Sequence, residues 1–174
     1  SVELRAGSVI TGNMTASGTN NLLVLGGDTT DATTTLGAGT YNGFSSYQKT
    51  GASTWTLTGA SAVATPWTIR AGTLSIADDA SLGDAGGALQ LIGGALQVTA
   101  STLSTRSIVL GDGGYLAGSI ETGTGATFTV NGTVSGNGRL TKIGAGTLQL
   151  GAVNTYGGGT LASAGTLQAA TTGA

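Results

Sequence analysis

The chain has 174 residues, of which 33 are glycine and only one is proline, and charged residues make up 8% of the total. Its six basic residues are scattered singly and the net charge is −2, which excludes nucleic acid as a partner because nothing here follows a phosphate backbone. No apolar run approaches the roughly 18 residues of a membrane span, so we expect no membrane insertion of this segment. Glycine and β-branched residues disfavour helix throughout, and the mean hydropathy of +0.24 argues against disorder.

Short β-strands are the elements that the sequence predicts. Residues 1–40 fit a β-rich chain by composition alone. A regular pattern begins further on, where the segment 49–76 recurs over 142–169 without gaps, at a displacement of 93 residues. A repeat of this kind indicates a stacked architecture in which each unit buries its apolar face against the next.

The stretch that leads into the second copy has a finer period of ten residues. Inside it, the alternation of Thr127, Phe128 and Thr129 sends neighbouring side chains to opposite faces of a strand. Each group of ten therefore predicts one strand and one turn, and three strands would give a coil of about 30 residues. The apolar residues that mark the period are Leu110, Ile120, Val130, Leu140 and Leu150.

These patterns predict an all-β fold, a right-handed three-faced parallel β-helix (β-solenoid) of roughly six coils. We expect residues 1–174 to form a single solenoid segment of a longer chain. An antiparallel sandwich is the alternative, because evenly spaced short strands build that fold too. The solenoid is favoured because a narrow prism suits uniform Leu, Ile and Val, and only 5% of the residues are aromatic.

The two repeat copies contain a sequence motif that resembles a known repeat. Residues 142–150 (KIGAGTLQL) and 164–167 (AGTL) resemble the autotransporter-associated β-strand repeat, and 49–59 (KTGASTWTLTG) looks like a second form of it. The first copy departs from the pattern at Thr65, Pro66 and Trp67, where Gly-Gly-Thr is missing. We expect its residues to be structural, with glycine at corners and leucine facing inward; they are Gly51, Thr54, Leu57, Gly72, Thr73, Leu74, Gly144, Gly146, Thr147, Leu148, Leu150, Gly165, Thr166 and Leu167.

This resemblance implies a type V secreted passenger of a Gram-negative bacterium, located at the cell surface or released. Such a passenger crosses the outer membrane through a C-terminal barrel domain, which we expect elsewhere in the full protein. The implied function is a rigid stalk and adhesin that contacts host cells, a matrix protein or glycan, or other bacteria. The alternative is a non-catalytic scaffold that presents a protease, esterase or glycan-cleaving domain, and self-association through strand edges is a third interpretation.

We expect no catalytic site and no cofactor in this segment. Histidine is absent, and with it every Ser-His or His-metal arrangement. Asp112, Glu121 and Arg106 would be the acidic and basic group of a glycan-cleaving solenoid, but nothing in the sequence places them on one face.

One weak metal site can be named. Asp78, Asp79 and Asp84 lie close together in a turn-like stretch, and with backbone carbonyls they would offer the oxygen ligands that Ca²⁺ prefers. The simpler interpretation is that Asp78 and Asp79 cap a solvated turn.

The aromatic residues are the candidates for contacting a ligand or partner. Tyr41, Tyr47 and Trp67 would stack on sugar rings or anchor a protein if they were exposed. The alternative is that they fill a wider part of the core or cover a loop. Trp55 shares a strand face with Leu57, so we expect it in the core instead.

Overall fold

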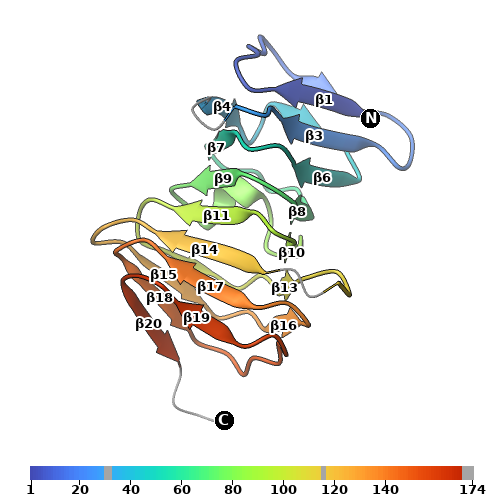
Figure 1. Ribbon diagram of the computed structural model, residues 1–174. Helices are drawn as coiled ribbons and strands as arrows, with labels where there is room; N and C mark the ends of the chain where they lie inside the picture. The colour runs from blue at the N-terminus through green and yellow to red at the C-terminus, as the bar shows by residue number, and fades with distance from the viewer. Residues whose placement is uncertain (30–32, 115–116, 170–174) are drawn as a thin grey trace.

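The structure, a computed structural model, describes residues 1–29, 33–114 and 117–169. Its strands stack as rungs from the N-terminal to the C-terminal end of the molecule, as Figure 1 shows, and every ladder between named strands is parallel. The predicted all-β parallel solenoid is confirmed. No helix in the described ranges is long and apolar enough to cross a membrane.

Three faces can be followed along the molecule. Sheet I contains β1 (Val2–Arg5), β3 (Leu22–Gly26), β6 (Ser46–Lys49), β8 (Trp67–Ile69), β10 (Leu89–Leu91), β13 (Ile108–Leu110) and β16 (Val134–Gly136). Sheet II contains β4 (Thr33–Gly37), β7 (Thr54–Thr58), β9 (Thr73–Ile76), β11 (Ala95–Val98), β14 (Gly118–Thr122), β17 (Leu140–Ile143) and β19 (Thr160–Ala162). The third face begins with β2 (Met14–Thr15) and β5 (Tyr41–Asn42) and resumes, as sheet III, with β12 (Thr102–Ser104), β15 (Thr127–Val130), β18 (Thr147–Leu150) and β20 (Thr166–Ala169).

The solenoid has about eight turns, so the prediction of six coils was wrong. In sheet I, Leu89 pairs with Ile108, 19 residues later, and Ile108 pairs with Val134, 26 residues later. The turns are shorter than 30 residues because strands of two to five residues are joined by short connections. The ten-residue period also gave no sign of β16, because this strand lies between the marker residues Val130 and Leu140.

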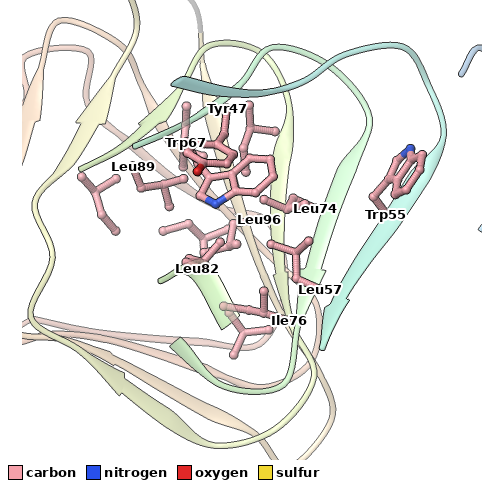
Figure 2. Packing of buried hydrophobic residues seen from close by; sticks show 14 of the residues in the cluster. Tyr47, Trp55, Leu57, Trp67, Leu74, Ile76, Leu82, Leu89 and Leu96 are labelled. Carbon is pink, nitrogen blue, oxygen red and sulfur yellow. The ribbon is translucent and has the colours of Figure 1, made fainter. Parts of the chain in front are cut away.

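The core consists of columns of inward-facing side chains, one from each turn. In sheet II, Trp55, Leu74, Leu96 and Ile120 occupy successive positions of one register column, and all are buried. Figure 2 shows part of this packing, with Leu74 and Leu96 of sheet II and Trp67 of sheet I all pointing into the interior. A fully buried Leu or Ile contributes about 1.5–3 kcal/mol relative to an exposed one, so each turn is stabilised mainly by its two neighbours.

The third face is interrupted in the middle of the molecule. Between β5 and β12 no strand continues it in the described residues; the short 3-10 helix η1 (Asp79–Leu82) lies there instead. Ser81 Oγ donates to the Gly59 carbonyl at 2.7 Å, and Ser61 N donates to the Ala80 carbonyl at 3.1 Å. These bonds fasten η1 to the loop of the preceding turn.

Candidate functional site

The aromatic residues named as ligand candidates lie in the core. Tyr41, Tyr47 and Trp67 are 2%, 0% and 1% exposed, so none of them is available for a partner. Their rings pack together, with centroids 5.2 Å apart for Tyr47 and Trp67 and 5.5 Å for Tyr41 and Tyr47. Their burial agrees with the alternative that they fill part of the core, because Trp67 alternates with Ile69 on the inner face of β8, beside Tyr47 of β6. Trp55 is buried as expected.

This aromatic cluster carries polar atoms that find no partner. The Tyr41 and Tyr47 hydroxyls and the Trp67 indole Nε1 are buried without a hydrogen bond. Burial raises the pKa of Tyr47, and burial together with the nearby Tyr47 raises that of Tyr41. Both phenols therefore stay neutral, and the cluster is core rather than a binding surface.

The three aspartates proposed for calcium have separate roles. Asp78 caps η1 by accepting from Ala80 N at 2.8 Å, and Asp84 accepts from Gly86 N at 2.9 Å. The Asp79 carboxylate faces a buried guanidinium instead. No group of three acidic, histidine or cysteine side chains able to hold a metal occurs in the described part of the chain. The turn-capping interpretation therefore holds for Asp78, but it was wrong for Asp79, whose carboxylate is buried against Arg106 rather than solvated.

Arg106 is the partner of Asp79, and it is 1% exposed. Arg106 Nε donates to Asp79 Oδ1 at 2.9 Å and Nη2 donates to Oδ2 at 3.1 Å. Its remaining donors reach the carbonyls of Gly87 at 2.6 Å and Gly83 at 2.9 Å. A buried arginine with this many acceptors holds the segment that replaces a strand on the third face.

The hypothetical glycan-cleaving group is not assembled. Arg106 is enclosed by Asp79 and backbone carbonyls, whereas Asp112 is exposed and accepts from Gly114 N at 3.1 Å. Glu121 lies on β14, half-buried on the outer side of sheet II. The three residues named for that chemistry therefore have different surroundings.

The two repeat copies, in contrast, share one local structure. The first copy forms β6 to β9 and the second forms β17 to β20. In the first, Arg70 N donates to Lys49 O at 2.9 Å; in the second, Ser163 N donates to Lys142 O at 2.9 Å. The leucines expected to face inward are buried, except Leu167 on the last rung, which is partly buried.

Each copy encloses a lysine that has no exposed surface. Lys49 Nζ donates to the carbonyls of Thr50 at 2.5 Å, Gly51 at 2.9 Å and Ala71 at 3.3 Å. The stem of Lys49 takes the place of an apolar residue, because its register neighbours in sheet I are Leu25 and Ile69.

Lys142 repeats this arrangement in the second copy. Its Nζ donates to the carbonyls of Ile143 at 2.7 Å, Gly144 at 2.7 Å and Ala164 at 3.2 Å. Each acceptor is displaced by 93 residues from its counterpart around Lys49. Lys142 nevertheless belongs to sheet II, where it pairs with Ile120, whereas Lys49 belongs to sheet I.

Burial governs the charge state of both lysines. It lowers the pKa of Lys49 to about 8, an effect that the nearby Asp28 partly offsets. Burial lowers the pKa of Lys142 as well, with Glu121 opposing the change. Three carbonyl acceptors match the three N–H donors of an ammonium, so the protonated form fills the site at neutral pH.

Sequence reasoning did not identify these lysines as buried, although the signal was present. Lys142 is two residues from Leu140, and Lys49 is two residues from Tyr47, so strand alternation places both on the inner face. Arg106 had no such signal, because its partner Asp79 is 27 residues away and outside any strand.

The comparisons with known proteins agree with this repeat geometry. The model of the passenger-associated-transport-repeat family matches residues 48–76 and 140–169, which are the two lysine-containing units. A curated relative, the adhesin BmaC autotransporter of Brucella suis biovar 1 (strain 1330), is 40% identical over 100 residues. The repeat matches and this similarity support an autotransporter passenger domain.

The match to the relative covers 57% of this passenger segment but only 3% of the length of the BmaC adhesin. The segment therefore corresponds to a small part of that protein. No solved structure matches the segment significantly.

Uncharged polar side chains occupy part of the outer faces of the passenger segment. On sheet II, Thr56 and Gln97 lie in one outward register column, with the buried Ser75 between them. On sheet I, Gln48, Thr68 and Gln90 occupy another. These columns present hydroxyl and amide groups at the regular spacing of parallel strands, about 4.8 Å.

A groove lies beside the interruption of the third face. Its volume is about 610 Å³, and its walls include Thr56, Leu57, Ala77, Ala80 and Thr99. The groove runs past the ends of β7 and β9 and is bounded by η1. Its lining is largely apolar, with Asp78 as the charged residue among the lining side chains.

Proposed function

We propose that this passenger segment is a rigid stalk and adhesive surface, displayed on or released from a Gram-negative cell. The single observation that carries the proposal is the continuous parallel ladder, with seven strands in each of two sheets. Each turn is hydrogen-bonded to the next, and a structure of this kind resists bending while it holds its outer faces in fixed positions. The similarity to BmaC, which is an adhesin, supports the adhesive part.

The proposed binding surface is the uncharged part of the outer face of sheet II or sheet I, and the partner is a host-cell or matrix protein, a glycan, or another bacterial surface. Ordered hydroxyl and amide groups, such as those of Thr56, Gln97, Gln48 and Gln90, form hydrogen bonds with sugars and with peptide groups. We propose no catalytic role for the segment. The burial of Arg106 against Asp79 supports this, because it removes the basic group that a glycan-cleaving site would need.

The test uses a surface-display strain whose passenger lacks residues 1–169, scored for adhesion and for passenger secretion. Two variants of the intact passenger separate the faces: Thr56→Lys with Gln97→Lys on sheet II, and Gln48→Lys with Gln90→Lys on sheet I. Each pair adds the same charge to one outer face and serves as the matched control for the other.

If the segment is adhesive, we expect one pair to reduce adhesion several-fold with normal secretion, while the other pair has no effect. Loss of adhesion on deletion alone, with both pairs normal, would assign the segment to the stalk only. Full adhesion and secretion after deletion would contradict both parts of the proposal.

A further inference from the structure

The buried lysines carry an inference that goes beyond the stalk and does not depend on adhesion. We propose that each transport repeat is a lysine clamp, a two-turn unit in which one buried ammonium joins the corner of one turn to the corner of the next. Lys49 reaches Thr50 and Gly51 in its own turn and Ala71 in the following turn. Lys142 does the same with Ile143, Gly144 and Ala164.

The second copy is an independent observation of the same device, because it lies on other faces of the solenoid. Lys49 occupies the corner from sheet I to sheet II, and Lys142 the corner from sheet II to sheet III. The apolar neighbours of the two lysines differ, yet the three acceptors of each ammonium are equivalent. The clamp is therefore a property of the repeat itself and can be placed at different corners.

Lysine suits this position for two reasons. Its four-carbon stem packs in a column of aliphatic side chains, where Lys49 lies between Leu25 and Ile69. Its ammonium then donates to three carbonyls that face it at the corner, so the nitrogen is buried with all three of its N–H donors paired. A leucine would fill the column but offer these carbonyls no donor.

Glycine at the next turn completes the unit. Gly72 has φ +64°, and a Cβ there would collide with the carbonyl oxygens of Gly51 and Ser53 and approach Lys49 Nζ to 2.7 Å. Gly165 has φ +68°, and a Cβ there would collide with the carbonyl oxygens of Gly144 and Gly146. The glycine of each Ala-Gly-Thr-Leu phrase thus leaves room for the clamp.

The consequence is that the interfaces between certain neighbouring turns are more stable than the others. In a solenoid, stability is approximately the sum of the interfaces between neighbouring turns, and separation starts at the weakest interface. A clamp adds a charged donor across one interface, so we expect turns joined within a repeat to separate less readily than turns without one. The transport repeats would then mark the points along a passenger where successive turns are fastened together.

The experiment compares Lys49→Met and Lys142→Met in the 174-residue chain by amide hydrogen exchange resolved along the sequence. Methionine keeps an unbranched stem and removes the ammonium. The matched controls are Arg70→Met and Arg139→Met, which remove one positive charge from exposed side chains close to each clamp. We expect exchange to become about tenfold faster at the corners of β6 to β9 in Lys49→Met and of β17 to β20 in Lys142→Met. The controls should leave both regions unchanged.

Exchange in the lysine variants that equals the controls, or that accelerates evenly along the chain, would overturn the proposal. A second measurement on the unaltered protein applies even if Lys49→Met does not fold. The ammonium protons of two lysines should exchange slowly enough to appear in ¹H–¹⁵N spectra of the side chains, because both are buried and hydrogen-bonded. Fast exchange of both ammonium groups would also contradict the clamp.

Discussion

The two transport repeats share a backbone and a clamp, but they differ in their position in the ladder and in the side chains around them. The first copy lies between other turns, and its inward residues Trp55, Leu74 and Ile76 are at most 1% exposed. In the second copy, β19 is exposed along its length and Leu167 is only partly buried. The local geometry is the same in both, so the clamp arises from the repeat and the depth of burial arises from the neighbouring turns.

The side chains that pack next to the buried lysine differ between the two copies, because the space beside the lysine differs. Ser53 of the first copy corresponds to Gly146 of the second, where a Cβ would collide with the carbonyls of Gly123 and Ala126. Ser53 Oγ instead donates to the Gly26 carbonyl at 3.0 Å, and Trp55 Nε1 donates to the same oxygen at 2.8 Å. The first copy therefore has contacts to the preceding turn that the second lacks.

The largest effect should come from adding a methyl group to the clamp glycines. Gly72→Ala places a Cβ against two carbonyl oxygens at positive φ, and we expect it to lower the free energy of unfolding by about 3–4 kcal/mol. Gly165→Ala has equal local strain on the last described rung, where opening of one turn relieves it, so we expect about 1 kcal/mol. Urea unfolding of both variants provides the measurement. Equal losses would show that position in the ladder does not matter.

A smaller loss of stability should follow from replacing a core residue of the first copy with its counterpart in the second. Trp55→Leu places in the first copy the residue that the second has at Leu148, and it removes a buried ring. We expect a loss of about 2–3 kcal/mol from the cavity, because the Gly26 carbonyl keeps its bond from Ser53. Urea unfolding again measures the change, with Thr56→Ala on the outer face of the same strand as the control. A loss below that of the control would mean that the neighbouring turns collapse into the space.

Features of the fold that depend on neighbouring residues could be predicted from the sequence, whereas contacts between residues far apart in the sequence could not. The repeat and the uniform aliphatic residues predicted the parallel ladder, and alternation within strands predicted the burial of Trp55. The same alternation applied to Trp67 and Lys49 would have placed both inside. The number of turns was not predictable from the ten-residue period, because corner lengths vary and β16 falls inside one period. The pairing of Arg106 with Asp79 joins a corner to a 3-10 helix 27 residues away, and no local pattern encodes it.

The charge of the clamp predicts a dependence on pH. Burial lowers the pKa of Lys49 to about 8, below the 10.5 of an unfolded lysine, so the folded state releases this proton first as the pH rises. Between those values the unfolded chain binds more protons, and stability should therefore rise with pH. The cost of burying the ammonium is fully present below about pH 8. We expect the urea midpoint of the unaltered protein to rise between pH 7.5 and 9.5 relative to that of Lys49→Met.

The buried phenols require this comparison between variants. The raised pKa values of Tyr41 and Tyr47 make stability fall above about pH 10, where unfolded tyrosines ionise. That effect is common to both proteins and cancels in the difference. A difference that is flat across the range would mean that the carbonyls hold the proton of Lys49 as firmly as water does.

The smallest effect should come from the aromatic cluster next to the first copy. Tyr47→Phe removes a buried hydroxyl that has no hydrogen-bond partner, so we expect no loss and up to about 1 kcal/mol of added stability. Tyr156→Phe in the second copy is the matched control, because its hydroxyl lies 2.7 Å from Thr160 Oγ1 and its removal should cost about 0.5 kcal/mol. Urea midpoints of both variants give the comparison. A Tyr47→Phe variant less stable than Tyr156→Phe would indicate an ordered water bound among these phenols and the Trp67 indole. The core of the first copy would then be stabilised by a polar contact that the second copy does not have.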